Sequence, residues 1–84
     1  MVTASQVRAA RALVDWSQQR LQDETGLSAT TIKRMENDKI GPGKSSVENL
    51  EKVRVALESA GVEFVESGVY QGNGGPGVRL RSEV

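Results

Sequence analysis

The first helix that the hydrophobic pattern predicts spans about residues 4–14. Its apolar positions recur three and four residues apart, as one face of a helix requires: Val7, Ala10, Leu13 and Val14. Thr3 stands before this stretch and Gln6 three residues after Thr3, which is the spacing of a capping box. Trp16 follows the segment. Because it is one aromatic residue after an apolar helix, we expect it to pack in the core rather than to stack on a base.

Two further short helices are predicted over about residues 18–25 and 29–36, with a tight turn between them. Ser17 and Ser28 stand where their N-caps belong, and Gly26 suits the left-handed residue that ends the first of the two. The inward-facing residues of this pair of helices are Leu21, Ile32 and Met35.

A loop and a longer helix are predicted next. Residues 37–44 contain Gly41-Pro42-Gly43, which interrupts a helix, and Gly61 marks the end of the helix that follows. Ser45 to Glu48 match the capping-box pattern at its start. Its apolar residues form one stripe: Val47, Leu50, Val53, Leu57 and Ala60.

After Gly61 the hydrophobic period changes from helical to alternating, which predicts two short strands. Two pairs of apolar residues share a face: Val62 with Phe64, and Val78 with Leu80. The glycine-rich stretch Ser67–Gly77 between them is expected to be a flexible loop. Glu63 is complementary in charge to Arg79 or Arg81, which favours antiparallel pairing. Because a two-stranded ribbon alone is marginal in water, it must pack on the preceding helix or pair with the same segment of a second chain.

The composition excludes several kinds of chemistry. The 84 residues suffice for one compact domain and include neither Cys nor His, which rules out disulfides, thiolate metal sites and imidazole catalysis. Gly72–Gly77 matches G-x-G-x-x-G, but Pro76 prevents the helix that a dinucleotide site needs. We therefore expect no enzyme, no cofactor and no metal.

The chain shows no signal for a membrane. Its apolar stretches are far shorter than the roughly 18 residues of a membrane span, and its N-terminal pattern is not that of a signal peptide. We expect a cytoplasmic protein. The net charge is zero, with seven basic and five acidic residues in positions 1–44 and four basic and six acidic residues in positions 45–84. This asymmetry is compatible with a basic face in the first half but does not by itself indicate one.

The stretch from Gln18 to Lys39 carries the functional signal. Two short helices joined by a tight turn can cross steeply, so that the second projects far enough to enter a DNA major groove roughly 12 Å wide. Here the chain resembles the Cro/C1-type (XRE) helix-turn-helix family of phage repressors and their bacterial relatives. The matching residues are Gln18, Leu21, Gly26, Ile32, Met35 and the run Met35-Glu36-Asn37. The resemblance covers about residues 5–60. The Trp16-Ser17-Gln18 opening and the Gly61–Phe64 and Gly75–Leu80 stretches of the C-terminal part resemble small single-domain regulators of bacteria.

The resemblance implies a mainly α fold of four to five helices with a short C-terminal two-strand β extension. Residues 1–61 would form the helix-turn-helix DNA-binding domain, and residues 62–84 an extension that packs on the fourth helix or contributes to a dimer. The implied function is that of a homodimeric transcriptional regulator, a repressor or autoregulator, which binds double-stranded DNA at an inverted repeat. The alternative is an antitoxin-like or antiactivator module that binds a protein partner, with DNA contact secondary; the zero net charge and Asp38 favour it.

Family geometry assigns roles to individual side chains. The candidates for base contacts are Ala29, Thr30, Lys33 and Arg34. Arg34 is the first choice, since a guanidinium can bind guanine in a bidentate manner worth about 1–3 kcal/mol of discrimination. The candidates for phosphate contacts are Gln18, Ser28, Asn37, Lys39 and Lys44. Four of these residues have a simpler interpretation as well: Lys33 and Arg34 as solvated charges, Ser28 as a helix cap, and Gln18 as an exposed polar side chain.

Three further positions matter to the resemblance. The family often pairs an arginine of its first helix with the glutamate that ends its third, which implies an internal ion pair between Arg11 and Glu36. Two residues depart from the family pattern. Gln22 stands where a small residue is usual because two helices approach closely, and Asp38 places a negative charge where glycine is frequent, near the expected phosphate path.

Overall fold

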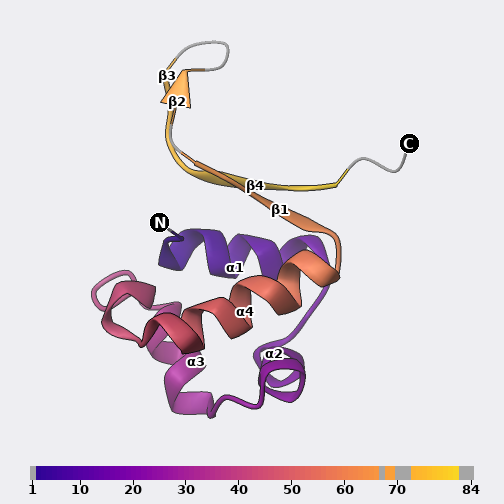
Figure 1. The fold of residues 1–84 in the computed structure, drawn as a ribbon, viewed down its shortest axis with the longest axis vertical. Helices are drawn as coiled ribbons and strands as arrows, with labels where there is room; N and C mark the ends of the chain where they lie inside the picture. Colours follow the sequence, from indigo (N-terminus) through magenta and orange to yellow (C-terminus); the bar gives the residue numbers. More distant parts are fainter. Residues whose placement is uncertain (1, 67, 70–72, 82–84) are drawn as a thin grey trace.

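Helices form one end of the molecule and a β-ribbon the other (Figure 1). The computed structural model describes residues 2–66, 68–69 and 73–81. Over this part of the chain it has four α-helices: α1 (Ala4–Leu13), α2 (Gln18–Thr25), α3 (Ala29–Met35) and α4 (Val47–Ser59). The mainly α fold with a C-terminal β extension is therefore confirmed.

The caps of the first three helices are those that the sequence predicts. The Thr3 hydroxyl accepts from the Gln6 backbone N–H at 3.2 Å, and the Gln6 side-chain oxygen accepts from the Thr3 N–H at 2.8 Å. Ser17 and Ser28 cap α2 and α3 through their hydroxyl oxygens. Gly26 ends α2 with φ of 74°, a left-handed conformation that costs glycine nothing because it has no Cβ.

The start of α4 differs from the prediction in two ways. Gly41-Pro42-Gly43 does not exclude helical structure, because Pro42 is the first residue of a short 3₁₀ helix, η1 (Pro42–Lys44). The first N–H of a helix has no partner within the helix, so proline is tolerated there. The predicted capping box that begins at Ser45 is wrong. The Ser45 N–H bonds to the Pro42 carbonyl at 3.0 Å and so ends η1. The cap of α4 is Ser46, whose hydroxyl accepts from the Asn49 N–H at 3.1 Å.

One hydrophobic core joins all four helices to the ribbon. Its most buried large side chains are Val7, Leu21, Ile32, Met35, Val53, Leu57 and Val62. Two predicted core residues are exposed instead, Leu13 by 40% and Val47 by 79%. Both stand six residues from a buried valine on the same helix, a spacing that rotates a side chain about 120° away from it. Trp16 packs against the core, as predicted, with the Arg20 guanidinium 4.9 Å from its ring centroid.

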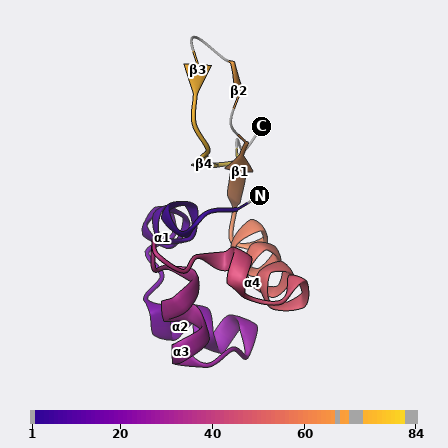
Figure 2. The same ribbon diagram turned by 90° about the vertical axis from the view of Figure 1, so that its left-hand side faces the viewer.

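The ribbon begins with β1 (Val62–Val65), which pairs antiparallel with β4 (Gly77–Leu80) as predicted. Glu63 lies opposite Arg79, and their side chains form an ion pair at 2.6 Å. Part of the predicted loop between these strands is a second small sheet, in which β2 (Gly68–Val69) pairs antiparallel with β3 (Asn73–Gly74). Strands are held together by backbone hydrogen bonds, so they can form without the alternating side-chain pattern that was used to predict them. Residues 67 and 70–72 of that prediction lie outside the described part. Figure 2 shows β2 and β3 extending beyond the helices.

The ribbon packs on α1 as well as on α4. Val62 is 1% exposed and belongs to the helical core. At the other end of the ladder, the buried Gln6 side-chain amide donates to the Val65 carbonyl at 3.1 Å and to the Gly77 carbonyl at 2.9 Å. One glutamine thus completes the cap of α1 and fastens both strands to it, a contact that the sequence pattern did not predict.

The Glu63–Arg79 pair makes the stability of the ribbon depend on pH. The hydrogen bond from Arg79 lowers the pKa of Glu63, so the pair stabilises the fold above the ordinary glutamate pKa of about 4.3. This contribution is lost as the pH falls through the lower pKa of the folded state. Thermal unfolding of E63Q from about pH 7 to pH 3 should therefore show a flatter decline below pH 4.3 than the wild type. Parallel curves for the two proteins would contradict the assignment.

Candidate nucleic-acid interface

The turn between α2 and α3 fixes the angle at which α3 is presented. The Thr25 hydroxyl donates to the Leu21 carbonyl at 2.6 Å and accepts from the Leu27 N–H at 3.2 Å. Leu21, Ile32 and Met35 are fully buried, so the two helices pack closely although Gln22, at the position where the family has a small residue, is partly buried. In Figures 1 and 2, α2 and α3 lie at the end of the molecule opposite the ribbon.

The outer face of α3 carries the predicted base-contacting residues. Thr30, Lys33 and Arg34 are exposed, and Ala29 is partly buried at the start of the helix. Within the described part of the chain, neither Lys33 nor Arg34 has an ion-pair partner. Their charges are therefore available to an external anion.

A basic hollow lies between α3 and the start of α4. Its lining residues are Thr31, Arg34, Lys39, Ile40, Lys44, Ser45, Ser46 and Asn49. It brings together one predicted base-contacting residue, Arg34, and two predicted phosphate-contacting residues, Lys39 and Lys44. The N-terminus of α4 adds partial positive charge to the same place. Thr31 and Asn49 also line the hollow and were not among the predicted site residues. A cap at Ser46, three residues before Asn49, would have placed Asn49 at the start of α4.

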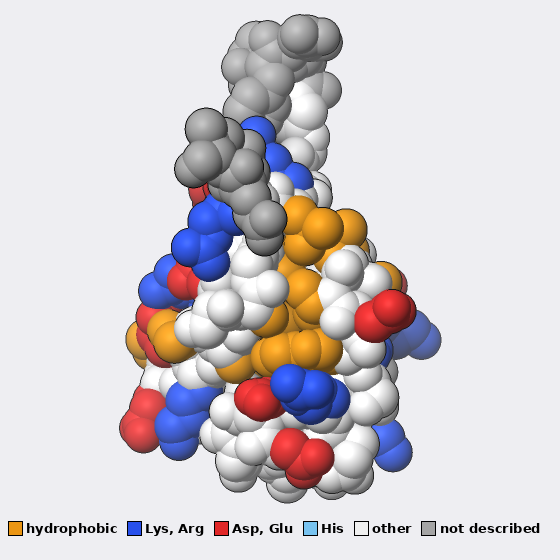
Figure 3. Space-filling view, turned by 90° about the vertical axis from the view of Figure 1, so that its right-hand side faces the viewer, with side chains coloured by type: hydrophobic (Ala, Val, Ile, Leu, Met, Phe, Trp, Pro, Cys, Tyr) orange, Lys and Arg blue, Asp and Glu red, His pale blue; other side chains and the backbone are white. Residues whose placement is uncertain are grey.

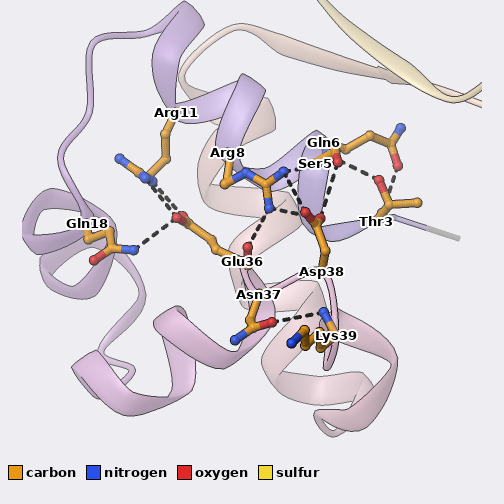
Figure 4. A network of polar contacts seen from close by, with 10 residues as sticks. All are labelled: Thr3, Ser5, Gln6, Arg8, Arg11, Gln18, Glu36, Asn37, Asp38 and Lys39. Carbon is orange, nitrogen blue, oxygen red and sulfur yellow. Dashed lines mark hydrogen bonds and ion pairs between the residues drawn. The ribbon is translucent and has the colours of Figure 1, made fainter.

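An internal ion pair joins α1 to the end of α3 (Figure 4). The Arg11 guanidinium donates to both carboxylate oxygens of Glu36, at 2.5 and 2.8 Å, and to the Trp16 carbonyl at 2.9 Å. Hydrogen bonding to Glu36 raises the pKa of Arg11, so its positive charge is permanent. The Glu36 side chain is 4% exposed, which places the pair inside the protein, as the resemblance implied.

Gln18 belongs to the same network. Its amide nitrogen donates to Glu36 at 3.0 Å, so the carboxylate ties α2 as well as α1 to α3. Because one amide N–H is used inside the protein, only the other could serve a phosphate. Ser28 is likewise occupied as the cap of α3. Phosphate contacts by Gln18 and Ser28 stay predictions.

Asp38, the second departure from the family pattern, is neutralised within the chain. Figure 4 shows its carboxylate turned toward α1, where Arg8 donates to it at 3.0 and 3.3 Å. Arg8 also donates to the Glu36 carbonyl at 2.5 Å. Asn37 holds the same loop through a hydrogen bond from the Lys39 N–H to its side-chain oxygen at 2.9 Å. The charge of Asp38 is thus compensated beside α1, and Lys39 follows a fixed turn.

The part of the chain that the structure describes contains neither a membrane-spanning helix nor a metal-binding cluster. None of the helices in this part is both long and apolar enough to cross a membrane. No group of three or more acidic side chains in the described ranges is placed to hold a metal ion.

Comparison with known proteins agrees with this geometry. A family model described as helix-turn-helix matches residues 7–57, from α1 to the end of the core-forming part of α4. The search of curated proteins returned no match. The family match spans more than half of the chain and includes α2, the turn and α3 in full. The chain therefore belongs to the Cro/C1-type (XRE) helix-turn-helix family, whose domains bind DNA and regulate transcription.

Proposed function

We propose that this protein is a homodimer that binds a specific inverted repeat in duplex DNA and represses transcription, including that of its own gene. The observation that carries the proposal is a set of cations around α3 that have no ion-pair partner among the described residues: Lys33, Arg34, Lys39 and Lys44. They lie beside the exposed second helix of a helix-turn-helix pair, where a major groove would be read and its phosphates neutralised.

The proposal divides the surface into two parts. The exposed face of α3 reads base edges, with Ala29 or Thr30 at its start against a thymine methyl group and Arg34 in its last turn directed at guanine. Lys39, Lys44 and the start of α4 fix the register on the phosphates. Two copies would place their α3 helices in successive major grooves, about 34–36 Å apart along the DNA.

Selection of bound sequences from random duplex DNA tests the proposal. We expect an inverted repeat to be enriched, and the logarithm of its binding constant to fall linearly with the logarithm of salt concentration. Retention of random duplexes without enrichment would reduce the function to nonspecific binding. The absence of salt-sensitive binding would overturn the proposal.

Replacing Arg34 should change specificity, whereas replacing Lys44 should change affinity alone. R34A is expected to lose about 1–3 kcal/mol of discrimination at one base pair, because a bidentate contact with guanine is removed. K44A should weaken all sequences alike and lower the salt slope by about one. Competition assays with the selected site and with single-base variants distinguish the two. Equal loss of discrimination in both variants would remove Arg34 from the base-reading role.

A protein-binding module is the second candidate, and one observation favours it. An open groove between α2 and α4 has apolar side chains at Val55 and Ala56 and, among its charged lining residues, three carboxylates, Glu24, Glu48 and Glu51, against one lysine, Lys52. Such a surface suits a basic segment of another protein rather than DNA. Co-purification with a stoichiometric partner, together with no affinity for the selected duplexes, would decide for this function.

A further inference from the structure

We infer that two copies of this chain associate through an apolar hollow where α1, α4 and β4 meet. The inference deepens the proposed function, on which it rests for the two-fold dimer, by naming the surface that joins the copies. The hollow is lined by Leu13, Val14, Trp16, Ala60, Gly61, Leu80 and Arg81. Figure 3 shows hydrophobic side chains gathered on this face of the molecule.

Two of the exposed large apolar residues meet in this hollow. Of the described residues, five large hydrophobic side chains are exposed: Leu13, Ile40, Val47, Val55 and Leu80. Leu13 and Leu80 come from distant parts of the sequence and line the same hollow, with Trp16 also in its wall. Leu80 is 52% exposed although it lies opposite the buried Val62 on the core-facing side of the ribbon. A contiguous exposed apolar surface with an aromatic residue is typical of an interface.

The charges beside the hollow complement each other under two-fold symmetry. Asp15, in the turn after α1, is exposed, and its carboxylate has no partner among the described residues. Arg81 follows β4 and is held beside α4 by its N–H bond to the Gly61 carbonyl at 2.7 Å. Its guanidinium donates to the Glu58 carbonyl and, within the described ranges, forms no direct ion pair, although its charge also acts on Glu63. A two-fold interface presents the same patch twice, so each Asp15 can meet the partner's Arg81.

The outer face of α4 suits a second copy less well. Its exposed valines, Val47 and Val55, are accompanied by the carboxylates of Glu48 and Glu51 and by Lys52. Both carboxylates are already paired on the same helix, Glu48 with Lys52 at 3.7 Å and Glu51 with Arg54 at 2.5 Å, so a second such face would find no unpaired charge to complement there. Exchange of strands between copies is not needed either, since β1 and β4 pair within one chain.

The hollow leaves the proposed DNA surface open. None of its lining residues belongs to α3, and Figure 1 shows α3 away from the ends of α1 and α4 that form it. A copy docked there would leave Arg34, Lys39 and Lys44 exposed in both protomers. Dimerisation and DNA binding can therefore be measured separately.

Sedimentation equilibrium of the full chain without DNA tests the inference. The wild type should show a concentration-dependent monomer–dimer equilibrium. L13E and L80E should each raise the dimer dissociation constant by about tenfold or more, because a charge enters the apolar contact. The matched control is V55E, which places the same charge on an exposed valine of α4 and should dimerise like the wild type. Circular dichroism confirms that each variant is folded.

A second pair of variants tests the charges. R81E should weaken dimerisation by setting two carboxylates against each other. Adding D15N to R81E should recover part of the loss, and asparagine is chosen because Asp15 has φ of 58°, a conformation that asparagine tolerates. The inference is overturned if the wild type stays monomeric at every soluble concentration, or if V55E disrupts the dimer while L13E and L80E do not. A dimer that meets these expectations but binds no DNA would refute the proposed function and leave the interface standing.

Discussion

R11M is expected to lower the free energy of unfolding by about 3–5 kcal/mol, as measured by urea denaturation at neutral pH. The substitution keeps much of the volume of the side chain but removes both hydrogen bonds that Arg11 gives to Glu36. The Glu36 side chain is 4% exposed, so its charge would remain inside the protein with the Gln18 amide as its remaining side-chain donor. A buried charge without a counter-charge is among the most costly changes that a fold can undergo.

Comparing R11M with E36Q shows how much of the loss in stability comes from leaving a buried charge without a partner. E36Q leaves Arg11, whose side chain is 19% exposed and can reach water, so its cost should be smaller than that of R11M. K52M breaks an exposed pair with Glu48, whose atoms lie 3.7 Å apart, and should change stability by less than about 1 kcal/mol. If R11M cost no more than K52M, the Arg11–Glu36 pair would not hold α1 against α3.

The elements that the sequence predicted well are those determined by neighbouring residues. A hydroxyl at Thr3, Ser17 or Ser28 satisfies an N–H within three residues, and the left-handed turn at Gly26 is set by the missing Cβ. Antiparallel pairing was predictable for a similar reason, since alternation leaves Glu63, Arg79 and Arg81 on the same face. The register was left open, and the structure places Arg79 opposite Glu63. Local chemistry and period were sufficient at these positions.

The errors have a physical cause as well. Leu13 and Val47 were placed in apolar stripes by counting steps of three, but a helix turns once in 3.6 residues and such steps drift off the buried face. The Ser45 cap was one residue early because the competing turn of η1 uses the Ser45 N–H. Neither error changes the fold, and the exposure of Leu13 instead supplies part of the proposed dimer surface.

The candidate site was predictable where the family resemblance constrains it and not where contacts are distant. Arg34, Lys39 and Lys44 were named from the motif, and the structure gathers them in one hollow. The pairing of Arg8 with Asp38 joins residues 30 positions apart and has no counterpart in the local pattern. From the sequence alone, Asp38 was therefore predicted to place an uncompensated negative charge near DNA.

For Gln6, local helix contacts and tertiary contacts predict opposite effects of a substitution on the free energy of unfolding. The variant Q6E tests which of the two dominates. In an isolated helix, a carboxylate at this position keeps the capping box and favours the helix dipole, so the substitution should be neutral or stabilising. In this protein the amide nitrogen is the donor that satisfies the Val65 and Gly77 carbonyls. A carboxylate would instead face two carbonyl oxygens at a position where the residue is only 3% exposed.

We therefore expect Q6E to lower the free energy of unfolding by about 3 kcal/mol, because two partly buried acceptors lose their donor and a buried charge takes the place of that donor. Amide hydrogen exchange should show the loss of protection concentrated in β1 and β4, while α2 and α3 stay protected. T3A is the matched control: it removes the cap of α1 and leaves the amide contacts in place, at a cost of about 1 kcal/mol. If Q6E were as stable as the wild type, the ribbon would be held to α1 by apolar contacts alone, and Gln6 would be a helix cap and nothing more.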